Sequence, residues 1–193
     1  MNRIAVDIDE VLMPFVEPMA KWRKLNMPDK QKYSYVYRSM FNISEKESRK
    51  MVAEFYKSQP FEMILPIKNS QKALNIIRDH CDKLYVITGR QEYARTETED
   101  WLDMHFPDIF DDVILTNSYT PREIYKPDIC TSLNIGVMID DNDMTCGMCK
   151  NAGIKPIHFA GHDGKNVYPW CHYDEDSVLS WKEVLEKLDI DVS

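Results

Sequence analysis

The sequence lacks a long hydrophobic run, an excess of positive charge and an even number of cysteines. No apolar run in its 193 residues approaches the roughly 20 that a membrane-spanning helix needs, which excludes a transmembrane protein. Lys and Arg total 24 against 32 Asp and Glu, a formal net charge of -8. That balance argues against long nucleic acid as the main partner, because the phosphate backbone favours basic proteins. Acidic residues at positions 7, 9, 10 and 17 argue against a signal or transit peptide, so a cytoplasmic protein is expected.

An odd count of five cysteines, with no export signal, favours reduced thiols over disulfides. One group of side chains has the composition of a zinc site: Cys146, Cys149, His158, His162, Cys171 and His172. Only eight residues separate the Cys pair from His158, whereas about twelve are usual in a zinc finger. The Cys pair also falls in a predicted helix and His158 in a predicted strand. Buried thiols and a hydrogen-bonded histidine are therefore favoured, and zinc is the alternative.

Hydrophobic periodicity predicts strands that alternate with helices along most of the chain. The expected strands are 3–8, 84–87, 113–115, 136–139 and 156–159, and the expected helices are 70–80, 92–105, 127–133, 143–151 and 177–188. Such alternation builds right-handed βαβ units, with a parallel sheet between two layers of helices. The predicted fold class is α/β, with a Rossmann-like three-layer αβα core.

A different segment interrupts this pattern after the first strand. Apolar side chains recur there at helical spacing: Phe15, Met19, Trp22 and Leu25. Ser44 and Glu47 form a capping-box pattern that opens a second helix through Phe55. We therefore expect residues 14–66 to form a helical cap subdomain, inserted into a core domain made of residues 1–13 and 67–193.

Polar side chains follow the predicted strands at the points where they end. These are Asp7 and Asp9, then Thr88, Gly89 and Arg90, and finally Asp140 and Asp141, with Lys126 between the third and fourth strands. The carboxyl ends of parallel strands meet at one edge of a sheet, so these groups are expected to converge. Four carboxylates crowded together are costly without a cation, and hard oxygen ligands favour Mg²⁺.

This set of groups suits phosphoryl transfer, although each short motif alone is common in solvated turns. One carboxylate can attack phosphorus and form an aspartyl phosphate. A second can protonate the leaving oxygen and later deprotonate water. A lysine, a metal ion and backbone amides can stabilise the phosphoryl oxygens.

The order of these motifs resembles the haloacid dehalogenase superfamily of phosphohydrolases. The matching segments are Asp7-Ile8-Asp9-Glu10-Val11-Leu12, Ile87-Thr88-Gly89-Arg90, Lys126 and Ile139-Asp140-Asp141-Asn142. Phe15, the segment from Phe61 to Pro66 and Leu179-Ser180-Trp181 narrow the resemblance to the 5′(3′)-deoxyribonucleotidase family. The resemblance covers nearly the whole chain. It implies Mg²⁺-dependent removal of phosphate from nucleoside monophosphates.

The resemblance also implies roles for the residues of the four motifs. Asp7 is expected to be the nucleophile and a metal ligand, and Asp9 the general acid/base, whose backbone carbonyl binds the metal. Asp141 is expected to bind the metal directly, with Asp140 in support. The phosphate-binding groups are expected to be Thr88, Gly89 and Lys126.

Further candidates concern the substrate. Phe15 matches an aromatic that stacks on the base in the family, and Tyr35 and Tyr37 alternate so that both could stack as well. Arg90 either reaches substrate or pairs with the nearby acids, and pairing is favoured. Gly89 stands where mammalian-type members carry a second hydroxyl, and Glu10 where a glycine is common, so substrate identity is more open than reaction type.

Charge is distributed unevenly along the chain. Residues 18–57 hold ten Lys and Arg against four acids, a net of +6, which leaves -14 on the remainder. A positive cap over an acidic edge would attract a small phosphorylated substrate. The resemblance implies a nucleotidase, and the charge pattern agrees with it; the protein is expected to be a monomer or a homodimer. The alternatives are a phosphatase of a sugar phosphate or other small phosphoester, and a non-catalytic metal- or partner-binding module.

Overall fold

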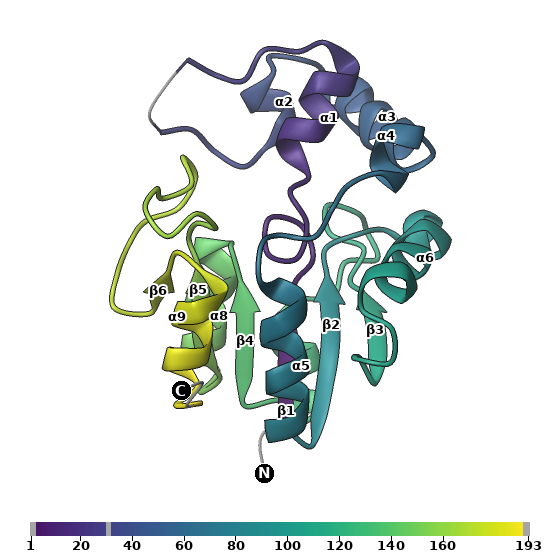
Figure 1. The fold of residues 1–193 in the computed structure, drawn as a ribbon. Coiled ribbons are helices and arrows are strands. Elements are labelled where there is room, and N and C mark those ends of the chain that lie inside the picture. Colours follow the sequence, from purple (N-terminus) through teal and green to yellow (C-terminus); the bar gives the residue numbers. More distant parts are fainter. Residues whose placement is uncertain (1–2, 30–31, 191–193) are drawn as a thin grey trace.

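A computed structural model describes residues 3–29 and 32–190 (Figure 1). In those ranges the strands form a single parallel sheet, in the order β3-β2-β1-β4-β5-β6. The strands are β1 Arg3–Val6, β2 Lys83–Thr88, β3 Asp112–Leu115, β4 Val137–Asp140, β5 Lys155–Phe159 and β6 Ser177–Val178. The order reverses beside β1, the first strand of the chain and one of the two in the middle of the sheet. This is the doubly wound arrangement that the sequence predicts.

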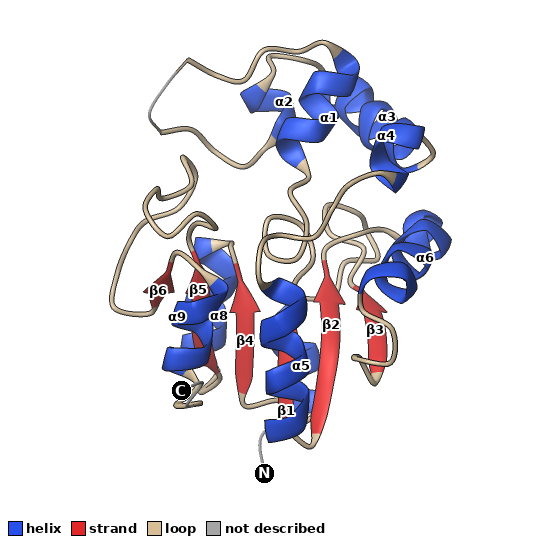
Figure 2. Cartoon of the chain, viewed as in Figure 1, coloured by secondary structure: helices blue, strands red, loops and turns tan. Residues whose placement is uncertain are grey.

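Helices cover both faces of the sheet. Successive residues of a strand point to opposite faces, and here apolar residues on both faces are buried under helices. The helices that follow the strands are α5 Ser70–His80, α6 Arg95–His105 after a short 3₁₀ turn at Glu92–Ala94, α7 Lys126–Ser132, α8 Asp143–Asn151 and α9 Trp181–Lys187. Ile4 and Val6 pack in one core with α5, α6 and α9, whereas Ala5 packs in a second core with α7 and α8. Figure 2 shows α5 and α9 in front of the sheet. The α/β class and the three layers are therefore confirmed.

Four further helices, the α1–α4 group, lie beyond the carboxyl ends of the strands (Figure 1). They are α1 Val16–Arg23, α2 Tyr37–Met40, α3 Glu45–Tyr56 and α4 Gln59–Glu62. The predicted capping box opens α3, since Ser44 Oγ accepts from the Glu47 amide and the Glu47 carboxylate accepts from the Ser44 amide. Phe15, Phe55 and Phe61 pack edge to face at the centre of the group.

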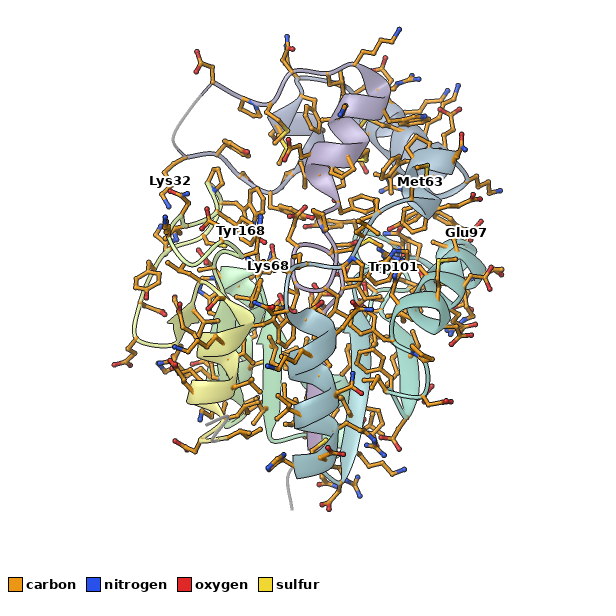
Figure 3. The ribbon with its side chains drawn as sticks, in the orientation of Figure 1. Lys32, Met63, Lys68, Glu97, Trp101 and Tyr168 are labelled. Carbon is orange, nitrogen blue, oxygen red and sulfur yellow. The ribbon has the colours of Figure 1, made fainter. Side chains whose placement is uncertain are left out.

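The α1–α4 group is joined to the sheet region by contacts on both sides. Trp101 of α6 donates its indole N–H to the carbonyl of Ile64, at 2.8 Å. Opposite, Lys32 Nζ donates to the carbonyl of Cys171, at 2.6 Å. Figure 3 labels Trp101 and Lys32 on these two sides. No helix within residues 3–29 and 32–190 is both long and apolar enough to cross a membrane.

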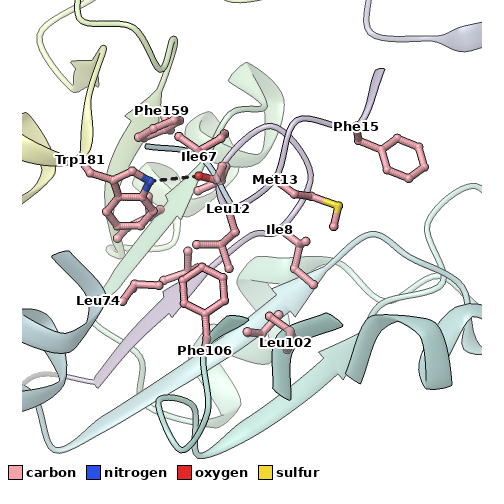
Figure 4. Packing of buried hydrophobic residues seen from close by; sticks show 14 of the residues in the cluster. Ile8, Leu12, Met13, Phe15, Ile67, Leu74, Leu102, Phe106, Phe159 and Trp181 are labelled. Carbon is pink, nitrogen blue, oxygen red and sulfur yellow. Dashed lines mark hydrogen bonds between the residues drawn. The ribbon is translucent and has the colours of Figure 1, made fainter. Parts of the chain in front are cut away.

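The loop after β1 packs into the core on the side of the sheet covered by α5 and α9. Ile8, Leu12 and Met13 of this loop are completely buried (Figure 4). Trp181, at the start of α9, donates its indole N–H to the carbonyl of Val11 at 3.1 Å. The segment that carries the first acidic motif is thus fixed by the last helix of the chain.

The predicted helix over 177–188 is wrong at its start. Ser177 and Val178 form β6, in which Val178 pairs with Phe159 at the edge of the sheet. The helix begins at Trp181, because the hydroxyl of Ser180 accepts from the Glu183 amide and caps it. Two short helices, α2 and α4, were not predicted from the sequence.

Candidate active site

The acidic motifs meet where the strand order reverses. Asp7 directly follows β1, and its amide donates to the carbonyl of Ile139 in the neighbouring β4, at 2.9 Å. Asp140 ends β4, and Thr88 ends β2 on the other side of β1. In open α/β sheets this edge is where ligands bind. The sheet therefore brings together the three segments that the sequence singles out.

Three carboxylates form a compact, buried group at this edge. Asp7, Asp140 and Asp141 each offer an oxygen, and these oxygens all lie within 4.8 Å of one another. Lys126, the first residue of α7, places its ammonium 2.8 Å from Asp7 Oδ2 and 2.6 Å from Asp140 Oδ2. The amide of Asn142 donates to the other Asp140 oxygen, at 2.9 Å. Asp140 is thus held by the protein on both oxygens.

The buried carboxylates are not fully balanced by charge. Burial raises the pKa of Asp7 to about 7, since Asp140 and Asp9 oppose the lowering effect of Lys126. Burial, Asp140 and Asp7 raise the pKa of Asp141 well above its usual value. Burial alone would lower the pKa of Lys126, but Asp140 and Asp7 raise it. One ammonium facing three carboxylates leaves a negative, all-oxygen donor set, which fits a hard divalent cation.

The carboxylate of Asp9 pairs with Arg90, outside the group formed by Asp7, Asp140 and Asp141. Arg90 donates to both of its carboxylate oxygens, from Nη2 at 2.6 Å and from Nε at 3.2 Å. The Arg90 side chain is completely buried, and its guanidinium lies over the rings of Phe15, Tyr56 and Phe61, at 5.1–5.7 Å from their centroids. Of the two alternatives for Arg90, the structure shows the ion pair.

Glu10 begins α1. Its Oε1 accepts from the amides of Phe15 at 2.9 Å and Val16 at 2.7 Å, which satisfies N–H groups at the helix start. Its backbone is left-handed, with φ of 62°, which explains why glycine is common here in the wider superfamily. Burial raises the pKa of Glu10 to about 7.

Aromatic side chains border the acid group on the side of the α1–α4 group. Trp170 donates its indole N–H to Asp141 Oδ2 at 2.8 Å, and its ring lies 4.9 Å from Tyr35. Tyr37 follows at 5.5 Å from Tyr35, and both tyrosines are half-buried. Phe15 is only 1% exposed, enclosed by the aromatic cluster. Sequence reasoning missed Trp170, because its loop has no periodic pattern and is 29 residues from Asp141.

The family comparison agrees with the motif order. A sequence model of the family described as 5′ nucleotidase, deoxy (pyrimidine), cytosolic type C protein matches residues 1–163. The chain belongs to this family. Membership makes it a haloacid dehalogenase superfamily phosphohydrolase, and hence a phosphoric monoester hydrolase. Among curated proteins, no sequence matches the chain.

Solved structures share the fold over nearly the full chain. A haloacid dehalogenase-like hydrolase from Streptococcus pneumoniae superposes with a TM-score of 0.69 at 15% identity, covering 97% of this chain and 98% of its own. A protein from Clostridium acetobutylicum described as a predicted phosphatase gives 0.67 at 16% identity, covering 97% of each chain. One from Haemophilus somnus, described as a predicted phosphoglycolate phosphatase, gives 0.65 at 11%, covering 97% and 98%. At these identities the likeness establishes the fold.

Gly89 directly follows Thr88 and leaves room for a side chain only in part. The space is partly filled from another loop, because a Cβ at Gly89 would lie 3.1 Å from Ser118 Oγ. Ser118 Oγ also lies 3.2 Å from the hydroxyl of Thr116. Sequence reasoning missed both hydroxyls, since they follow β3 in a segment without a motif.

The cysteines and histidines of the predicted zinc alternative are not brought together as the sequence grouped them. Among the described residues, Cys146, Cys149, His158 and His162 do not form one ligand group. His162 instead contacts the Tyr168 hydroxyl at 2.9 Å. All five cysteines are free thiols, as predicted. His158 lies in another group, with Asp143 and Cys171.

Proposed function

We propose that the protein is a Mg²⁺-dependent phosphatase of nucleoside monophosphates that acts through an aspartyl phosphate. The observation that supports this most directly is the buried group of Asp7, Asp140 and Asp141 around Lys126 at the reversal of strand order. We further propose that residues 14–66 act as the cap over a core made of residues 1–13 and 67–193.

The metal would be held by Asp7, Asp141 and the backbone carbonyl of Asp9, with Asp140 in support. When bound, Mg²⁺ supplies positive charge that neutralises the phosphoryl oxygens. Thr88, the Gly89 amide and Lys126 would bind the same phosphoryl group from the protein side. Lys126 already contacts Asp7 at 2.8 Å, which orients the nucleophile and offsets its charge.

The first half of the reaction transfers phosphorus to Asp7. A carboxylate oxygen of Asp7 forms a bond to phosphorus while the bond from phosphorus to the ester oxygen breaks. Asp9 gives a proton to the leaving oxygen, and the nucleoside departs as an alcohol. For this, Asp9 must present a protonated oxygen toward the substrate while it stays oriented by Arg90.

The second half returns the enzyme to its starting state. Asp9, now a carboxylate, takes a proton from water as the water oxygen attacks phosphorus. The bond between phosphorus and Asp7 breaks, and inorganic phosphate leaves. Atoms and protons balance over the cycle, with one water consumed for each ester bond broken.

Nucleotides are favoured over other small phosphoesters by the family and by the aromatic border. Tyr35, Tyr37 and Trp170 lie next to the acid group, and stacking on such rings can contribute about 1–3 kcal/mol per base. A sugar phosphate or other small phosphoester is the second candidate, favoured by the likeness to the protein described as a phosphoglycolate phosphatase. The intact set of acids and lysine argues against a non-catalytic module.

A phosphatase screen with Mg²⁺ over nucleoside monophosphates and sugar phosphates tests the proposal. Phosphate release from at least one nucleoside monophosphate is expected, and its loss in Asp7→Asn tests the nucleophile. Turnover of sugar phosphates alone would overturn the substrate assignment, and unchanged turnover by Asp7→Asn would overturn the mechanism. The cytoplasmic location and the monomeric or homodimeric state stay predictions.

A further inference from the structure

A second group of potential metal ligands lies behind the acid pair. Asp143, His158 and Cys171 each offer one ligand atom, and these atoms all lie within 4.8 Å of one another. They come from the start of α8, from β5 and from the loop before β6. This group contains nitrogen and sulfur, whereas the catalytic group offers only oxygen.

The geometry of the group centres on the carboxylate of Asp143. Its Oδ1 lies 3.0 Å from His158 Nε2, and its Oδ2 lies 2.5 Å from His172 Nδ1. Cys171 Sγ and His158 Nε2 both face the carbonyl oxygen of Asp141, at 3.0 and 3.3 Å. An imidazole, a thiol and a carboxylate therefore converge on one point, and the imidazole of His172 lies on the outer oxygen of the same carboxylate. A cavity of ≈ 210 Å³, lined in part by Asp143, His158 and His172, adjoins it.

Hydrogen bonds on Nδ1 orient the ring of His158, as they do in metal-binding histidines, and leave Nε2 facing the ligand group. His158 Nδ1 lies 3.0 Å from Ser177 Oγ, and Ser177 Oγ lies 2.8 Å from Asp174 Oδ1. With a metal on Nε2, Nδ1 would donate to the serine oxygen while the hydroxyl proton goes to the Asp174 carboxylate. Nε2 faces Asp143 Oδ1 at 3.0 Å and the Asp141 carbonyl at 3.3 Å. A cation among these three atoms would satisfy all of them.

We propose that Asp143, His158, Cys171 and His172 form a Zn²⁺ site. Cysteine sulfur and histidine nitrogen select zinc over magnesium, and four protein ligands are typical of a closed structural site. His158 and Cys171 are buried, at 3% and 1% exposure, so two of the four ligands are already placed by the core. The exposed imidazole of His172, which contacts Asp143 Oδ2, would turn to complete the set from the solvent side.

The proposed zinc would connect the segment that carries the acid pair to the loop before β6. Asp143 follows Asp141 by two residues, and Cys171 follows Trp170, which donates to Asp141. A zinc ion bound there would fix both segments that position Asp141. The site would thus be structural support for the acid pair, separate from the Mg²⁺ that the acids themselves would hold.

Zinc titration of metal-free protein against a chromophoric chelator tests the site. One zinc ion per chain is expected to bind, with Mg²⁺ in excess unable to displace it. Cys171→Ser and His158→Gln should lose this binding, and Ser177→Ala should weaken it by about 10- to 100-fold. Cys81→Ser and His162→Gln are matched controls that should bind as the wild type does.

Cobalt substitution provides a readout independent of activity. A thiolate-to-cobalt absorption band is expected in the wild type and in Cys146→Ser, and should be absent in Cys171→Ser. His172→Asn alters an exposed side chain, so it keeps the test informative if the buried variants do not fold. Failure to bind zinc, unchanged affinity in His172→Asn, or loss of the cobalt band in Cys146→Ser instead of Cys171→Ser would each overturn the proposal.

Discussion

Arg90 donates two hydrogen bonds to the carboxylate of Asp9, at 2.6 Å and 3.2 Å, while its own side chain is inaccessible to solvent. Thr98 Oγ1 accepts a third bond from the same guanidinium, at 3.0 Å. The planar guanidinium fork matches the two carboxylate oxygens, a geometry that the freely rotating ammonium of a lysine does not impose. The pair therefore fixes the direction in which the Asp9 side chain points.

Replacing Arg90 with Lys is expected to lower kcat by about 10- to 100-fold, because it preserves the charge but releases the orientation of Asp9. Steady-state kinetics with p-nitrophenyl phosphate measure the change, and KM should shift little. Arg95→Lys, which alters an exposed arginine paired with Glu92 and Glu99, is the control and should leave kcat unchanged. An equal kcat in Arg90→Lys and wild type would show that the fork does not position Asp9.

Mg²⁺ affinity is expected to rise with pH. Burial raises the pKa of Asp7 to about 7 and that of Asp141 well above its usual value, so both carboxylates hold protons at a higher pH than ordinary aspartates do. Metal ligands must be deprotonated, so protons oppose Mg²⁺ at low pH and are released when it binds. Calorimetry at about pH 6 and about pH 8 should show tighter binding at the higher value. Affinity that falls with pH would contradict the assignment of these ligands.

Tyr35→Ala is expected to reduce kcat/KM for a nucleoside monophosphate by about 5- to 150-fold, the equivalent of one lost stacking contact. Ribose 5-phosphate carries no base, so its turnover should be unaffected. Tyr35→Phe retains the ring and should resemble the wild type. An equal loss on both substrates would mean that Tyr35 supports the proposed cap and does not contact the base.

Trp181→Ala is expected to lower the free energy of unfolding by about 3–5 kcal/mol, because it empties a buried aromatic site. Trp181→Phe keeps most of the volume but leaves the buried carbonyl of Val11 without its indole donor, at a cost of about 1–3 kcal/mol. Urea unfolding measures both, and Tyr173→Phe, at an exposed side chain, is the control. If the Phe variant is as stable as the wild type, the bond to Val11 does not support the loop after β1.

The parts of the fold with strong local patterns were predictable from the sequence. The apolar face of α5 produces the predicted helix over 70–80, and the capping pair at Ser44 produces α3. The convergence of Asp7, Thr88 and Asp140 followed from parallel strands alone, since their carboxyl ends must share one edge. Local pattern and simple topology were sufficient there.

Features that depend on distant partners were not predictable. Trp170 contacts Asp141 from a loop without periodicity, and β6 is only two residues long, held by pairing with β5. Ser118 fills the space left by Gly89 because separate loops meet there. Arg90 was ambiguous because its environment of buried rings comes from three elements that only the fold assembles.

The position of β1 in the sheet also has a consequence during synthesis on the ribosome. Ile4 pairs with Leu84 on one side and with Val137 on the other, so this apolar strand leaves the ribosome long before either neighbour exists. Contacts so distant in the chain form slowly, and unpaired strands are prone to aggregate. Nascent chains that end before residue 137 still lack half of the pairing of β1 and the acid pair. In such chains one edge of β1 is unpaired and open to non-native pairing.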